Sequence, residues 1–133
     1  MSDYQNRQSA TEDQKTVKTI LVVEDDEDFG AFLTQALLQE TPYQAMLVSD
    51  GFQALKAVRN LIPNLFLLDY HLPSMDGIEL HDHLRATKEL ADIPVIMFSA
   101  DLPTPELQER GIIIIEKPTE LDILLQAITK LLT

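Results

Sequence analysis

Acidic side chains lie at the ends of two predicted strands in this 133-residue chain. Asp69 directly follows the apolar residues 65–68, and Glu24 and Asp25 directly follow the largely β-branched residues 19–23. Four large apolar residues in a row are typical of a strand that is buried on both faces. A carboxylate at the end of such a strand has to be paired, neutralised or coordinated to a cation, or it has to react.

Ordinary structural explanations also exist for these carboxylates. Asp is a common turn residue, and Asp69 precedes a turn that contains Pro, Ser, Asp and Gly. The acidic run that begins at Glu24 precedes an amphipathic helix, where carboxylates cap free amides and offset the helix dipole. This explanation suits residues 26–28 best, which leaves Glu24 and Asp25 as candidate site residues.

Polar residues stand at two further strand ends. Ser99 follows the apolar residues 94–98, and Lys117 closely follows the four isoleucines at 112–115. Taken singly, Ser99 is an ordinary turn residue and Lys117 an ordinary strand-end lysine that reaches solvent. Ligands of open α/β sheets, however, bind outside the carboxyl ends of the strands. We therefore group all of these polar strand ends into one predicted site.

The charges of this predicted site have to be balanced. If the first and third strands are neighbours, Glu24, Asp25 and Asp69 converge, and at about 4 Å each like-charge pair costs on the order of 4 kcal/mol. Mg²⁺ answers this repulsion, because it suits open, oxygen-rich sites and often bridges to phosphate. Lys117 and Ser99 would then face an anion with several acceptor oxygens, such as a phosphoryl group on Asp69.

Strand and helix patterns alternate five times along the chain. The predicted strands are residues 19–23, 43–48, 65–68, 94–98 and 112–115. The helical patterns occupy residues 29–40, 51–62, 77–84, 101–110 and 119–132. This order predicts a parallel sheet with helices on both faces. The helix within 101–110 should be short and weakly anchored, since that segment has two prolines and one interior apolar residue.

Two smaller predictions concern the helices. Thr119 is the predicted N-cap of the last helix, because Asp122 three residues later resembles a capping box. His81 and His83 lie two residues apart on a predicted helix, so they point to different faces and do not form a metal pair. We expect both histidines to be solvated at the surface.

Composition limits the remaining possibilities. The chain is 45% hydrophobic and 24% charged, which is typical of one globular domain, preceded by a polar, flexible tail at residues 1–17. It contains no cysteine, which excludes disulfides and thiolate chemistry. A net charge of -12 argues against direct binding to nucleic acid. Since no apolar run is long enough for a signal peptide or a membrane span, we expect a soluble cytoplasmic protein.

Four motifs together point to a known family. They are Glu24-Asp25-Asp26, Asp69 with Leu72-Pro73-Ser74-Met75-Asp76-Gly77, the segment 94–100 ending in Ser99-Ala100, and Lys117-Pro118. Over residues 19–132 the chain resembles the receiver domain of two-component response regulators. The resemblance implies a receiver domain at residues 18–133 with a flavodoxin-like, doubly wound sheet of five parallel strands in the order 2-1-3-4-5.

The resemblance also implies roles for the reactive residues. Asp69 matches the phosphoacceptor, which takes a phosphoryl group from a phosphohistidine. Ser99 matches the hydroxyl that moves to the phosphoryl oxygen, and Lys117 matches the lysine that pairs with it. The Lys117–Pro118 peptide bond would be cis. The chain would assist its own phosphorylation rather than act as an enzyme.

A Mg²⁺ site follows from the same resemblance. Asp25 and Asp69 match direct ligands, Glu24 matches the acidic neighbour that reaches the ion through water, and the backbone carbonyl of His71 matches the remaining protein ligand. The implied partners are a histidine kinase or histidine phosphotransfer protein and a downstream protein target.

Three departures from the family pattern leave alternatives open. Ile114 replaces the usual aromatic switch residue, the segment between Ser99 and Lys117 is short, and the chain stops after the last helix, so that we expect no output domain. A stand-alone phosphoacceptor is the first hypothesis, and a receiver-shaped adaptor that acts without phosphorylation is the second. A dehalogenase-type phosphotransferase is disfavoured, because it needs a second Asp where His71 stands.

Overall fold

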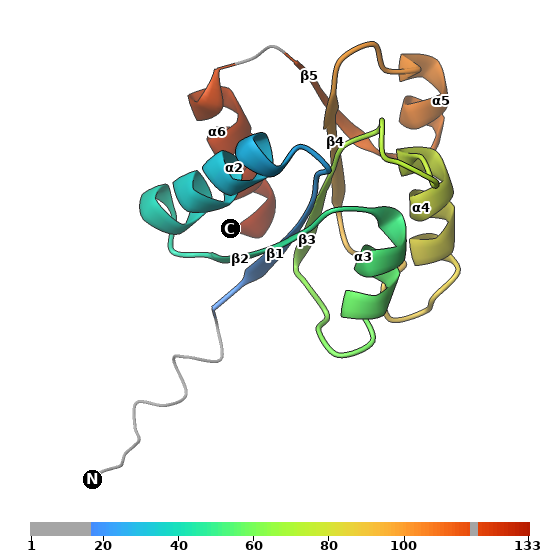
Figure 1. The fold of residues 1–133 in the computed structure, drawn as a ribbon, viewed down its shortest axis with the longest axis horizontal. Helices are drawn as coiled ribbons and strands as arrows, with labels where there is room; N and C mark the ends of the chain where they lie inside the picture. The colour runs from blue at the N-terminus through green and yellow to red at the C-terminus, as the bar shows by residue number, and fades with distance from the viewer. Residues whose placement is uncertain (1–16, 118–119) are drawn as a thin grey trace, which may run out of the picture.

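Five parallel strands form one sheet in the order β2-β1-β3-β4-β5 (Figure 1). The strands are β1 (Thr19–Val23), β2 (Gln44–Val48), β3 (Leu65–Leu68), β4 (Val95–Ser99) and β5 (Ile113–Glu116). The computed structural model describes residues 17–117 and 120–133. The predicted α/β class and the flavodoxin-like strand order are confirmed.

Helices cover both faces of the sheet. Figure 1 shows α2 (Glu27–Glu40) and α6 (Leu121–Leu132) on one face, and α3 (Gly51–Ala57), α4 (Gly77–Arg85) and α5 (Thr104–Glu109) on the other. Alternate strand residues face opposite sides, so Leu65 and Leu67 pack in the cluster with α2 and α6. Phe66 and Leu68 pack in the cluster with α3, α4 and α5. This two-sided burial explains why the strand before Asp69 is continuously apolar.

Two helices are short. α3 ends at Ala57, although the apolar period continues to Ile62. Tight i to i+3 hydrogen bonds follow from residues 59 and 60, and Pro63 prevents the helix from continuing, so Ile62 is left exposed. α5 has six residues and one wholly buried side chain, Leu107, as the sequence predicted.

The prediction of two solvated histidines is wrong for His81. His83 is exposed, but His81 is only 3% exposed, and its Nδ1 has no hydrogen-bond partner among the described residues. α4 lies between α3 and α5 (Figure 1), and Arg110, just after α5, pairs with Asp82. His81 lies on the same face of α4 as the buried Gly77, Leu80 and Leu84, so the i, i+3, i+4, i+7 spacing itself turns it towards the core.

Some predictions fall outside the described residues. These are the flexible tail (apart from Val17), the cis Lys117–Pro118 bond and the side-chain cap at Thr119. Among the described residues, Glu120 occupies the N-cap position of α6. Within residues 17–117 and 120–133, every helix is too short or too polar to cross a membrane.

Candidate functional site

The sheet itself fixes the backbone of the candidate site residues. The N–H of Glu24 donates to the carbonyl of Val48 at 3.0 Å, and the N–H of Asp69 donates to that of Val23 at 2.9 Å. The N–H of Lys117 donates to the carbonyl of Ser99 at 3.0 Å. Each residue thus adds one hydrogen bond to the end of a parallel ladder, so strand pairing rather than loop conformation places these side chains.

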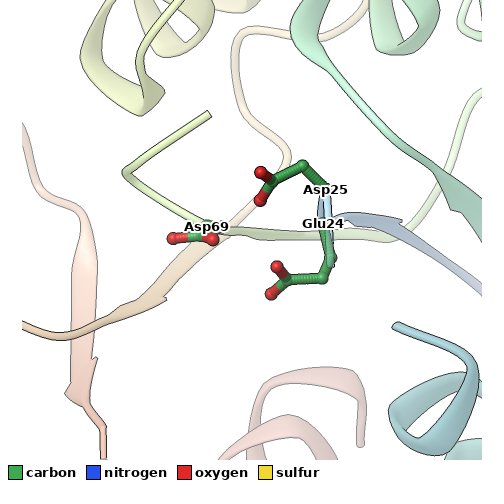
Figure 2. Close-up of side chains that lie close together, drawn as sticks. All are labelled: Glu24, Asp25 and Asp69. Carbon is green, nitrogen blue, oxygen red and sulfur yellow. The ribbon is translucent and has the colours of Figure 1, made fainter. Parts of the chain in front are cut away.

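Three carboxylates meet at this edge of the sheet. Glu24 and Asp25 extend from the end of β1 and Asp69 from the end of β3, and Figure 2 shows the three side chains around a common space. Each offers one oxygen that lies within 4.8 Å of those of the other two. Glu24 and Asp69 are 5% and 9% exposed, whereas Asp25 is open to solvent.

Glu24 is the carboxylate of this group whose ionised form is disfavoured by its surroundings. Burial raises the pKa of its carboxyl from an ordinary value of 4.5 to about 7. The N–H of Asp26, 3.1 Å from Oε2, and the ammonium of Lys117, 3.3 Å from Oε1, act against this rise, and the negative charge of Asp69 adds to it. One lysine therefore does not fully compensate the buried acidic charge.

This arrangement fits a hard divalent cation. Carboxylate oxygens are the ligands that Mg²⁺ prefers, and the exposure of Asp25 leaves an open side on which the ion could keep its waters. The structure also places His71 beside the cluster, where its N–H donates to Oδ1 of Asp69 at 3.1 Å. The role of its carbonyl as a ligand stays a prediction.

Ser99 lies directly against Asp69. Its hydroxyl donates to Oδ1 of Asp69 and accepts the N–H of Tyr70 at 2.6 Å, and the side chain is 1% exposed. The hydroxyl thus links the end of β4 to the loop after β3. The structure brings Ser99 and Asp69 together, as the grouping of strand ends expected.

Two residues near Lys117 were missed by reasoning from the sequence. The Nζ atom of Lys117 lies 4.3 Å from the ring centroid of Phe29 and 5.2 Å from that of Phe98. Both phenylalanines fit their helix and strand patterns as core residues, so the patterns gave no separate signal. The sequence did hold one usable signal, which was the position of Phe29 in the first turn of the helix capped by Asp26, next to Glu24 and Asp25.

Ile114, which stands where the family pattern has an aromatic residue, is half-buried on β5. It packs against the core cluster that β3 and β4 share with α3, α4 and α5. The side chain offers neither an aromatic face nor a polar group to the site.

Comparison with known proteins gives a consistent result. Residues 20–129 match the family described as the response regulator receiver domain. The DNA-binding response regulator MtrA of Mycobacterium tuberculosis is 41% identical over 88 residues, which are 66% of this chain and 37% of that protein. The transcriptional regulatory protein PhoP of Bacillus subtilis is 40% identical over 83 residues, 62% of this chain and 33% of that protein. The aligned region thus spans about a third of the length of these relatives.

Solved structures agree with the sequence matches. The receiver domain of a histidine kinase from Syntrophus aciditrophicus has 31% identity and a TM-score of 0.78, covering 87% of this chain and 90% of that one. A sensor kinase receiver domain from Pseudomonas aeruginosa, described with a magnesium ion in its active site cleft, has 25% identity and a TM-score of 0.76, covering 87% and 98%. The match over residues 20–129 and the fold show that the chain belongs to the response regulator receiver domain family of two-component signalling.

Proposed function

We propose that this chain is a phosphoacceptor receiver in which Asp69 takes a phosphoryl group from the phosphohistidine of a sensor kinase or phosphotransfer protein. One observation carries the proposal. The buried carboxylate of Asp69 lies between a serine hydroxyl that it accepts from and a cluster of two further carboxylates, with the ammonium of Lys117 on Glu24. A carboxylate that only capped a strand would not need these neighbours.

The hydrogen bonds of Asp69 indicate which oxygen reacts. Ser99 and the N–H of His71 both hold Oδ1, which leaves Oδ2 to attack phosphorus. The new P–O bond forms in line with the P–N bond of the phosphohistidine, whose electron pair returns to the departing imidazole. Lys117 contacts Glu24 at 3.3 Å, and Glu24 and Asp69 offer oxygens within 4.8 Å of each other, so we expect Lys117 to turn towards the added phosphoryl oxygens.

Glu24, Asp25 and Asp69 would hold Mg²⁺, with the carbonyl of His71 as the further protein ligand that the resemblance implies. Bound Mg²⁺ supplies positive charge to the carboxylates and to the transferring oxygens. The reaction modifies the chain itself, so we class the protein as a phosphoacceptor that assists its own phosphorylation and dephosphorylation, not as an enzyme with a separate substrate.

A second candidate function is that of an adaptor that binds its partner without phosphorylation. The six-residue α5 and the aliphatic Ile114 favour it, because both alter the part of the fold that would report the modification. In either case we propose a protein as the downstream partner, since the ten basic residues carry too little charge, against 22 acidic ones, for this domain itself to bind nucleic acid.

A small phosphodonor distinguishes the two functions. We expect acetyl phosphate with Mg²⁺ to add one acid-labile phosphoryl group, detected by intact-mass spectrometry, and Asp69→Asn to abolish it. Asp50→Asn is the matched control, because Asp50 caps α3 and is not one of the clustered carboxylates, and Asn caps equally well. An unmodified wild-type protein would favour the adaptor, and labelling of the Asp69→Asn protein would refute the assignment of the acceptor.

A further inference from the structure

Lys117 is held by aromatic rings as well as by a carboxylate. Its Nζ atom lies over the ring of Phe29 at 4.3 Å and 5.2 Å from the ring centre of Phe98, in addition to its 3.3 Å contact with Glu24. The first ring comes from the first turn of α2 and the second from β4. Together with Glu24 at the end of β1, these two rings bring three elements to one ammonium group at the end of β5.

We propose that Phe29, supported by Phe98, is a positioning residue that holds the ammonium of Lys117 at the acceptor site. The inference rests on the proposed function, since it assigns a role to Lys117 in phosphoryl transfer. A cation near the face of an aromatic ring is attracted by the ring quadrupole. Phe29 acts on the reaction through Lys117 and does not itself touch the phosphoryl group.

The rings are themselves fixed in place. The N–H of Phe29 donates to Oδ1 of the helix cap Asp26 at 3.0 Å, which sets the start of α2. The ring of Phe29 packs on that of Phe98 with centroids 5.8 Å apart, and on that of Phe32 at 6.3 Å. A rigid pair of rings limits where the flexible lysine side chain can place its charge.

An aromatic partner suits a lysine that has to change its bonding. Glu24 attracts the ammonium strongly but also competes with an incoming phosphoryl group for it. A ring attracts the ammonium without neutralising it and leaves its N–H donors free. Phe29 can therefore keep Lys117 beside the carboxylate cluster while the lysine exchanges one oxygen partner for another.

The first test needs no phosphorylation. Protons near an aromatic face are shielded, so we expect the Hε signals of Lys117 to lie upfield of ordinary lysine values in NMR spectra. Phe29→Leu should remove most of this shift, whereas Phe29→Tyr should keep it. Phe52→Leu is the matched control, because Phe52 is an exposed ring on another helix, α3. Ordinary Hε shifts in the wild type, or an unchanged shift in Phe29→Leu, would overturn the proposal.

The second test measures the initial rate of phosphorylation by acetyl phosphate at saturating Mg²⁺. We expect Phe29→Leu to lower the rate by about three- to thirtyfold, the range that the loss of one cation–π contact implies. Phe29→Tyr and Phe52→Leu should retain the wild-type rate, and equal rates for Phe29→Leu and Phe52→Leu would contradict the proposal.

Two safeguards keep the tests decisive. If Phe29→Leu does not fold, Phe98→Leu and the wild-type Hε shifts replace it, and unshifted signals in the wild type would still refute the contact. If the wild type accepts no phosphoryl group, the proposed function fails, but the NMR comparison still decides whether Phe29 holds Lys117.

Discussion

Replacing Glu24 with glutamine tests the electrostatic reasoning behind the site. Glu24 is 5% exposed, and burial raises the pKa of its carboxyl from 4.5 to about 7. Glutamine has nearly the same shape, can accept the N–H of Asp26 and never ionises. We therefore expect Glu24→Gln to stabilise the protein when no metal is present and the pH is above 7.

The sign and size follow from proton linkage. Between pH 4.5 and about 7 the unfolded chain has already lost the proton of Glu24, whereas the folded protein keeps it, so stability falls as the pH rises through this window. At about 1.4 kcal/mol for each pH unit, the loss above pH 7 amounts to about 3 kcal/mol. The gain from Glu24→Gln should grow from near zero at pH 4.5 to about 3 kcal/mol at pH 8. The lost ion pair with Lys117 is already counted, because Lys117 lowers that pKa.

Urea denaturation with a chelator at pH 5 and pH 8 measures this difference. Asp25→Asn is the matched control, since Asp25 belongs to the same cluster but is exposed, so that solvent screens its charge and its removal should gain much less than Glu24→Gln. Adding Mg²⁺ at pH 8 should stabilise the wild type more than Glu24→Gln. If Glu24→Gln is no more stable than the wild type at pH 8, or if Asp25→Asn gains as much, burial of Glu24 is not the cause and the reasoning fails.

Two further predictions use the same denaturation assay. Ser99→Ala removes a buried hydroxyl and leaves the N–H of Tyr70 without its acceptor, so it should lower the unfolding free energy by about 1 to 3 kcal/mol, whereas Ser99→Thr should lose less; an unchanged Ser99→Ala protein would contradict the observed bonds. Burial lowers the pKa of His81 below its ordinary value of 6.5. Below about pH 6.5 the unfolded chain therefore takes up a proton that the folded protein resists, so the stability of the wild type falls as the pH is lowered. The stability of His81→Leu relative to the wild type should therefore rise as the pH is lowered from 7.5 to 5.5. A constant difference in stability would show that His81 does not titrate in this range.

The fold and most of the site could be predicted from the sequence because their signals are local. Apolar runs of four or five residues mark the strands. The residue that follows such a run also lies at the end of the hydrogen-bond ladder between two neighbouring strands. Glu24, Asp69 and Lys117 are of this kind, since each makes the first backbone hydrogen bond beyond its strand. A rule about strand ends therefore brought these residues together without any knowledge of side-chain packing.

The features that the sequence did not predict depend on contacts between elements. His81 is an exception: it shares the buried i, i+3, i+4, i+7 face of α4 with Gly77, Leu80 and Leu84, so the helical period held the signal and only the polarity of histidine argued against it. The ring of Phe29 faces Lys117 because α2 begins and β5 ends at this edge of the sheet, and the two residues are 88 positions apart in the chain. Helical spacing classified Phe29 with the core and could not separate a ring that faces leucines from one that faces a cation.

The hydrogen bonds of Ser99 indicate how the site could respond with Ile114 in place of an aromatic residue. The backbone at the strand ends is held by the ladder, so the first response to phosphorylation has to come from side chains. Once Asp69 is phosphorylated its carboxyl is no longer an anion, so moving Ser99 to a phosphoryl oxygen breaks a neutral hydrogen bond of about 0.5 to 1.5 kcal/mol and leaves the N–H of Tyr70 unpaired at about 1 to 3 kcal/mol. The new bond is charge-assisted and worth about 1.5 to 3 kcal/mol. The two positions are then close in free energy, which is the condition under which one added charge shifts the population. If Asp69 is phosphorylated as proposed, we therefore expect Ser99, and not the side chain of Ile114, to be the element that phosphorylation biases.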